Sequence, residues 1–120
     1  MCESYINTAF FISYNRMTKA VLIHEDEGHL NDIEIDIDPI KNEIFKNLGG
    51  PATFIGQWPD LDVVIMKCTT AQIKNMNTIP HPFQDEVVFG KVLLIRMDKY
   101  SEPRDFTLDE YTHFKKMSLE

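Results

Sequence analysis

The sequence predicts an α+β domain: an antiparallel or mixed sheet of about five strands with one helix packed on it, followed by a C-terminal helix. Three observations favour this class. Residues 30–38 alternate apolar and acidic side chains, which is the pattern of a half-buried strand. Residues 39–48 repeat apolar side chains at helical spacing. Residues 53–58 and 61–68 are two strand-like runs joined by Pro59-Asp60, as in a β-hairpin.

The first hairpin is predicted from an apolar run at residues 19–24, a polar turn at residues 25–29 and the alternating strand at residues 30–38. In that strand the isoleucines are expected to face the core. The acidic side chains are expected to face water, and they are Asp32, Glu34, Asp36 and Asp38.

A helix is expected to begin at Asp38-Pro39, where Asp38 caps free amides and Pro39 loses nothing by lacking an N–H. Gly49-Gly50 is expected to end it, because a left-handed residue after a helix favours glycine. The side chains predicted to share one apolar face are Ile40, Ile44, Phe45 and Leu48.

Residues 69–86 are predicted to form a long loop, because Pro80 and Pro82 cannot donate to a sheet. A short helical turn is expected near residues 71–75. Residues 87–97 return to a strand pattern, with Gly90 at a bulge.

The C-terminal helix is placed at residues 105–117. Thr107 and Glu110 have the spacing of a capping box, and Phe106 and Tyr111 occupy the two hydrophobic-staple positions.

The 120 residues are read as a single domain. Residues 19–97 form its core, and residues 1–18 are an N-terminal extension or an extra strand. Within that extension, residues 5–14 are rich in β formers and are a candidate edge for homo-oligomer formation.

Acidic residues are concentrated in one segment. Residues 25–38 contain seven acidic side chains and no Lys or Arg, which accounts for the whole net charge of −7. Such a balance argues against direct binding to nucleic acid or to anionic membranes. It leaves three interpretations open: cation binding, a basic protein partner, or solubility alone, which is the commonest. Two cysteines, no signal peptide and no membrane-spanning run favour an intracellular, cytoplasmic protein.

With these elements in this order, the chain resembles a family of small single-domain proteins known as a domain of unknown function. The residues that carry the resemblance are Lys19-Ala-Val-Leu-Ile-His24, Leu48-Gly-Gly50 with Ala52-Thr-Phe-Ile-Gly-Gln-Trp58, and Phe89-Gly-Lys-Val-Leu-Leu-Ile95. The resemblance covers residues 19–97 and leaves the Thr107 helix outside. It implies relatives in bacteria, phages, algae and algal viruses, and it implies a fold without an activity.

Two surfaces are candidates for partner binding. The strand carboxylates Asp32, Glu34 and Asp36 recur roughly 6–7 Å apart along one face, which also raises the hypothesis of an acidic nucleic-acid mimic. The second surface is apolar, and its candidate anchors are Trp58, Ile79 and Phe83, of which the last two flank a proline-stiffened loop. The alternative for each anchor is that it covers the open end of the core.

Two sets of residues are candidates for a chemical site. His24, Glu25 and His29 at the first turn combine imidazole with carboxylate and are weak metal-ligand candidates, although their spacing matches no established motif. Cys68, His81 and Asp85 supply the residue types of a Cys–His–acid nucleophile and are weak catalytic candidates. No cofactor is expected.

The sequence therefore favours a non-catalytic protein-interaction or regulatory module with an acidic binding face. The alternatives are a small enzyme with a site around the 69–86 loop, an acidic nucleic-acid mimic and a cation-responsive module.

Overall fold

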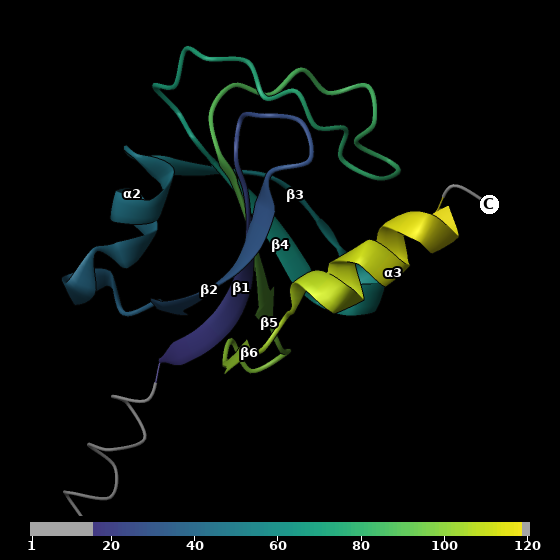
Figure 1. Cartoon of the computed structure of the whole chain (residues 1–120). Coiled ribbons are helices and arrows are strands. Elements are labelled where there is room, and N and C mark those ends of the chain that lie inside the picture. Colours follow the sequence, from purple (N-terminus) through teal and green to yellow (C-terminus); the bar gives the residue numbers. More distant parts are fainter. Residues whose placement is uncertain (1–15, 119–120) are drawn as a thin grey trace, which may run out of the picture.

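The computed structural model describes residues 16–118 and contains a six-stranded antiparallel sheet, a short helix after the second strand and a C-terminal helix (Figure 1). This is the α+β class predicted from the sequence. The strands β2-β1-β5-β4-β3 are neighbours in that order, and β6 pairs with β5. Their bounds are β1 Met17–Ile23, β2 Leu30–Asp36, β3 Ala52–Trp58, β4 Val63–Cys68, β5 Val92–Met97 and β6 Pro103–Arg104.

Both predicted hairpins are present. β1 pairs with β2 over its whole length, from Met17 opposite Asp36 to Ile23 opposite Leu30. β3 pairs with β4, with a bulge between Phe54 and Gly56. The two-residue β6 was not predicted, because a two-residue strand is too short to show any periodicity.

The predicted first helix is interrupted. A 3₁₀ turn, η1 (Pro39–Lys41), is followed by α2 (Glu43–Leu48), and Asn42 between them has a left-handed φ of 61°. Asp38 caps the first piece as expected, since its side chain accepts from Ile40 N, and Gly49 ends the second at φ 81°. Because of the break, Ile40 is 87% exposed rather than facing the core.

The chain between β4 and β5 is irregular, and the helical turn expected near residues 71–75 is absent there. Instead, Lys74 and Phe89 form an isolated antiparallel bridge. The sheet resumes only at Val92, and Gly90 just before it has a φ of 85°. The prolines therefore lie in a loop, as predicted, although the loop extends beyond residue 86.

The last helix, α3 (Leu108–Ser118), begins with the predicted capping box. Glu110 N donates to Thr107 Oγ1 at 3.2 Å, and Thr107 N donates to Glu110 Oε1 at 3.3 Å. The staple residues Phe106 and Tyr111 are both buried, with ring centroids 6.5 Å apart. Burial raises the pKa of the Tyr111 hydroxyl.

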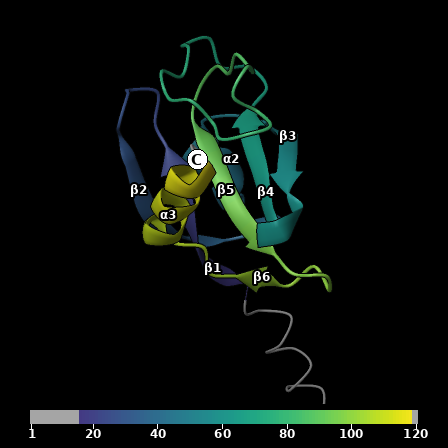
Figure 2. The ribbon, with the colours of Figure 1, turned by 90° about the vertical axis from the view of Figure 1, so that its right-hand side faces the viewer.

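Each face of the sheet carries its own hydrophobic cluster. Figure 2 shows α3 in front of the sheet and α2 behind it. On the α3 face, Val21, Leu94 and Tyr111 belong to a cluster that also includes Trp58. On the α2 face, Leu22, Leu93 and Leu48 pack together. Strands covered on both faces explain the near-continuous apolar runs of β1 and β5.

Within residues 16–118, no helix combines the length and the apolar character that crossing a membrane requires. Residues 17 and 18, predicted to belong to the N-terminal extension, form the start of β1. The predicted self-association segment at residues 5–14 lies outside the described residues.

Candidate functional site

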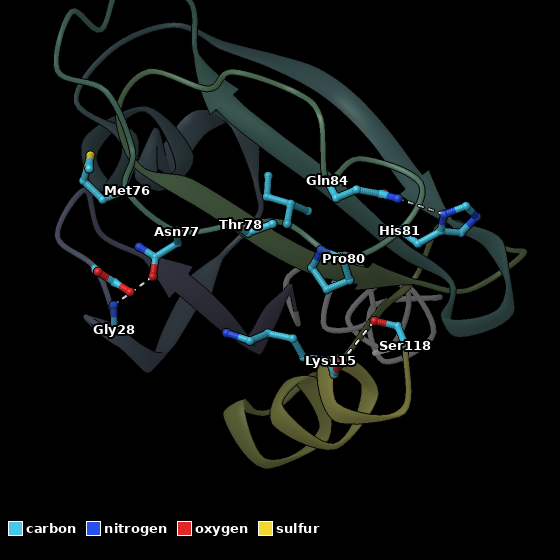
Figure 3. Close-up of a pocket in the computed structure, with 11 residues that line it drawn as sticks. Gly28, Met76, Asn77, Thr78, Pro80, His81, Gln84, Lys115 and Ser118 are labelled. Carbon is cyan, nitrogen blue, oxygen red and sulfur yellow. Dashed lines mark hydrogen bonds between the residues drawn. The ribbon is translucent and has the colours of Figure 1, made fainter. Parts of the chain in front are cut away.

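A groove of about 430 Å³ lies where three segments distant in the sequence meet (Figure 3). The turn of the first hairpin supplies Glu27 and Gly28. The loop supplies a continuous stretch from Met76 to His81, together with Gln84. The last turn of α3 supplies Lys115 and Ser118.

The loop side of the groove is fixed by a buried asparagine. Asn75 is 6% exposed, and its Nδ2 donates to the carbonyl oxygen of Gly90 at 2.8 Å. Its backbone N donates to Val88 O at 2.8 Å, and its Oδ1 accepts from Asn77 N at 2.9 Å. These bonds satisfy Asn75 inside the fold and hold both ends of the irregular segment together.

Asn77 connects the loop to the first hairpin. Its Nδ2 donates to the carbonyl oxygens of His24 and Asp26, both at 2.9 Å, and its Oδ1 accepts from Gly28 N at 2.8 Å. Gly28 has a left-handed φ of 78°. In addition, Met76 N donates to Glu25 O at 2.8 Å. The Asn77 side chain and the Met76 amide therefore bind the loop to main-chain atoms of the turn, and the turn's acidic side chains take no part in these bonds.

The three apolar anchor candidates from the sequence belong to the core or pack against it next to the groove. Trp58 and Ile79 are each 4% exposed and belong to the core on the α3 face, and Phe83 packs against that core. Trp58 Nε1 donates to His81 O at 3.0 Å, and its ring lies 5.0 Å from the ring of Phe114 in α3. These three side chains hold the loop against the helix, and Trp58 and Ile79 are too deeply buried to anchor a partner.

The open part of the groove is mixed in charge. Glu27 stands on the hairpin side, Lys115 on the helix side, and Thr78 and His81 on the loop between them. Gln84 Nε2 lies 3.4 Å from His81 Nδ1, and Figure 3 marks this contact with a dashed line. This arrangement can pair with charges and donate or accept hydrogen bonds, and no cysteine lines it.

The catalytic candidates are not brought together. Cys68 is buried in the cluster on the α2 face, where a hydrogen bond from Thr70 Oγ1, 3.3 Å from Sγ, lowers the pKa of its thiol. His81 is exposed and lines the groove, which lies against α3. Asp85 is also exposed, outside the residues that line the groove. The sheet therefore separates the thiol from the imidazole.

The metal-ligand candidates His24 and His29 stack on each other at the first turn. The rings of His24 and His29 stack face to face, 3.8 Å between centroids and 13° from parallel, and His24 Nε2 is hydrogen bonded to Asn31 Oδ1 at 2.6 Å. Stacked rings do not aim their nitrogens at one point. Across residues 16–118 no group of three or more His, Cys, Asp or Glu side chains is placed to hold a metal ion.

The predicted acidic row is only partly open to water. Asp32 and Glu34 are exposed, but Asp32 Oδ1 accepts from Leu108 N at 2.6 Å. Asp36 was expected to face water and is instead 9% exposed, with its Oδ1 accepting from Asp38 N at 2.9 Å. The strand ends at Asp36, so its carboxylate folds back to bind the following turn. A continuous phosphate-like row is not displayed.

Sequence reasoning missed the central role of Asn75 and Asn77 in this site. The two-residue spacing of Asn75 and Asn77 could have indicated it. An asparagine side chain readily accepts a hydrogen bond from the backbone two residues onward, as Asn75 does here. Lys115 and Ser118 carried no signal, because their place in the groove depends on how α3 docks.

No curated protein and no solved structure is detectably similar to this chain. A family model does match, over residues 21–114. The match includes the first part of α3, which the resemblance seen in the sequence had left outside the shared region. The chain belongs to the family of unknown function DUF5880.

Proposed function

We propose that this chain is a non-catalytic protein-interaction module that receives a basic segment of a partner protein in the groove beside the first hairpin turn. One observation carries the proposal: the turn presents the carboxylates of Glu25, Asp26 and Glu27 from a backbone that Asn77 and Met76 fix in place. A fixed backbone lowers the conformational entropy lost on binding.

The charge of the turn supports a cationic partner. Asp26 has a side chain 85% exposed, and its only ionic contact in the described chain is a long one of 3.6 Å to His29 Nδ1. Side-chain hydrogen bonds to Glu25 or Glu27 are absent from residues 16–118. Free carboxylates at a rim attract cationic partners and raise association rates more than they raise affinity.

The rest of the groove supports a peptide rather than a bare cation. Met76 is 60% exposed and offers an adaptable apolar contact next to the acidic turn. Thr78 and Gln84 can hydrogen bond a main chain, and Lys115 on the opposite wall can pair with a carboxylate. A segment with a basic residue at the turn, an apolar side chain at Met76 and a carboxylate at Lys115 would match both walls and bind in one direction.

The separation of Cys68 from His81 favours this binding role over the alternative of a small enzyme. A nucleophile needs its base within hydrogen-bonding distance, and here the sheet lies between them.

The test is a selection of random peptides on the immobilised full-length protein. We expect enriched peptides to combine Lys or Arg with an apolar residue. A synthetic copy of an enriched peptide is then added to the protein in two-dimensional NMR. It should shift the backbone amide resonances of Gly28, Asn77, Thr78 and Lys115. A failure to enrich any peptide, or shifts confined to other surfaces, would refute the proposal.

Charge variants sharpen the test. The triple variant Glu25→Gln, Asp26→Asn and Glu27→Gln removes the charge of the turn. It should lower the affinity for the selected peptide by about tenfold or more, mostly by lowering the association rate. The matched control removes the same charge from exposed acids elsewhere, with Glu34→Gln, Asp60→Asn and Asp109→Asn. Equal weakening by both sets would show that only net charge matters and that the groove is not the site.

A further inference from the structure

The outer edge of β3 is the uncharged edge of the sheet. β3 stands last in the strand order, opposite β2, and Figure 2 shows it at one margin of the sheet. Among residues 16–118, no strand pairs with its outer side. From Pro51 to Pro59 the sequence contains no charged residue. Native proteins commonly protect an open edge with charge, and β2 carries Asp32, Glu34 and Asp36.

Apolar side chains lie next to this edge on the α2 face. Phe54 is 64% exposed and is paired in register with Met66. Phe45 of α2 is 44% exposed. A shallow pocket of about 300 Å³ lies between α2 and the strands. Its lining includes the apolar Ile44, Phe45, Ala52 and Met66 and the acidic Asp38 and Glu43. Main-chain groups and apolar surface are therefore offered together along one side of the molecule.

The bulge between Phe54 and Gly56 determines which part of the edge is usable. A bulge bends its strand and interrupts regular pairing. It separates residues 52–54, beside the pocket, from residues 56–58, where Phe83 packs over Gly56. The first part is the one that combines an open backbone with the exposed Phe54 ring.

We propose that a second copy of this chain pairs antiparallel with β3 over residues 52–54, extending the sheet across a twofold axis. A twofold interface brings each patch against itself and must be self-complementary. Because the chain has a net charge of −7, a strand rich in carboxylates, such as β2, would repel its own copy, whereas residues 51–59 place no charged side chain along the paired strands. The two Phe54 rings would become cross-strand neighbours on the α2 face.

The test is the mass of the full-length protein in solution over a concentration series, by sedimentation velocity or light scattering. We expect a concentration-dependent species of twice the mass of the 14.0 kDa chain. Hydrogen exchange should slow at backbone amides of β3 as the concentration rises. A monomer at every concentration, or a dimer without protection in β3, would overturn the proposal. Protection of β3 only by an added apolar peptide would assign the edge to another protein.

Variants identify the interface. Phe54→Lys should remove the dimer, because two lysines would then face each other across the axis. The matched control is Tyr100→Lys, which adds the same charge at an aromatic side chain 73% exposed in a distant turn, and it should leave the dimer intact. A third variant, Phe11→Asp, tests the segment predicted at residues 5–14. Loss of the dimer in Phe11→Asp but not in Phe54→Lys would overturn the proposal. If a variant fails to fold, hydrogen exchange in the β3 amides of the natural protein still tests the proposal.

Discussion

Asp32 in β2 and Leu108 in α3 are joined by a hydrogen bond of 2.6 Å from the Leu108 amide to the Asp32 carboxylate. The acceptor comes from a strand 76 positions earlier in the chain. It satisfies one of the free N–H groups at the helix start and places negative charge near the positive end of the helix. Asp32, one of the three strand carboxylates predicted to bind a partner, is thus part of the contact that docks α3.

Replacing Asp32 with Ala should therefore destabilise the fold by about 1 kcal/mol, the usual effect of losing a cap. Urea denaturation measures the change. Glu34→Ala is the control, because Glu34 is exposed on the same strand and makes no side-chain hydrogen bond within residues 16–118. If both variants lose the same stability, the bond to Leu108 contributes nothing specific.

Asn75 should be the most sensitive polar side chain of the loop. Asn75→Ala leaves the carbonyl oxygen of Gly90 and the amide of Asn77 without their partner, at a cost of about 1–3 kcal/mol. Asn47→Ala is a suitable comparison, since Asn47 makes one hydrogen bond to its own helix, to Glu43 O, and should change little. A similar loss in the two variants would contradict the role assigned to Asn75.

Part of the fold could be predicted because its signals are local. The alternation at residues 30–36 and the Thr107–Glu110 box both operate within a few residues, and both predictions are confirmed. Asp36 was misplaced because periodicity does not show where a strand ends. The break at Asn42 depends on a single left-handed residue, and the pattern of apolar side chains continues across it. The groove was missed because Glu27, Asn77 and Lys115 meet only after the sheet and α3 have assembled.

Acid should weaken the fold partly through Asp98. Hydrogen bonds from the backbone amides of Glu102 and Tyr100, and from Arg104, lower the pKa of Asp98 below its ordinary value of 3.8. A carboxylate with a depressed pKa in the folded state stabilises the fold above its unfolded pKa. It loses this contribution as the pH falls through the folded value.

Stability measured by urea denaturation should consequently fall more steeply below pH 3.8 in the natural protein than in Asp98→Asn. The matched control is Asp60→Asn, which removes one carboxylate from an exposed aspartate outside this hydrogen-bond network. Identical slopes in all three proteins would mean that Asp98 is not a source of the acid sensitivity.

Gly28 and Gly90 provide a matched pair for testing the backbone of the site, because both have a left-handed φ, of 78° and 85°. A Cβ at Gly28 would have no atom within 4 Å, so Gly28→Ala should cost only the conformational penalty, about 1–2 kcal/mol. A Cβ at Gly90 would lie 2.4 Å from the Cβ of Ala71, so Gly90→Ala should add about 1–3 kcal/mol for the clash. Thermal and urea denaturation compare the two variants directly. Equal losses would show that Ala71 does not pack closely against Gly90.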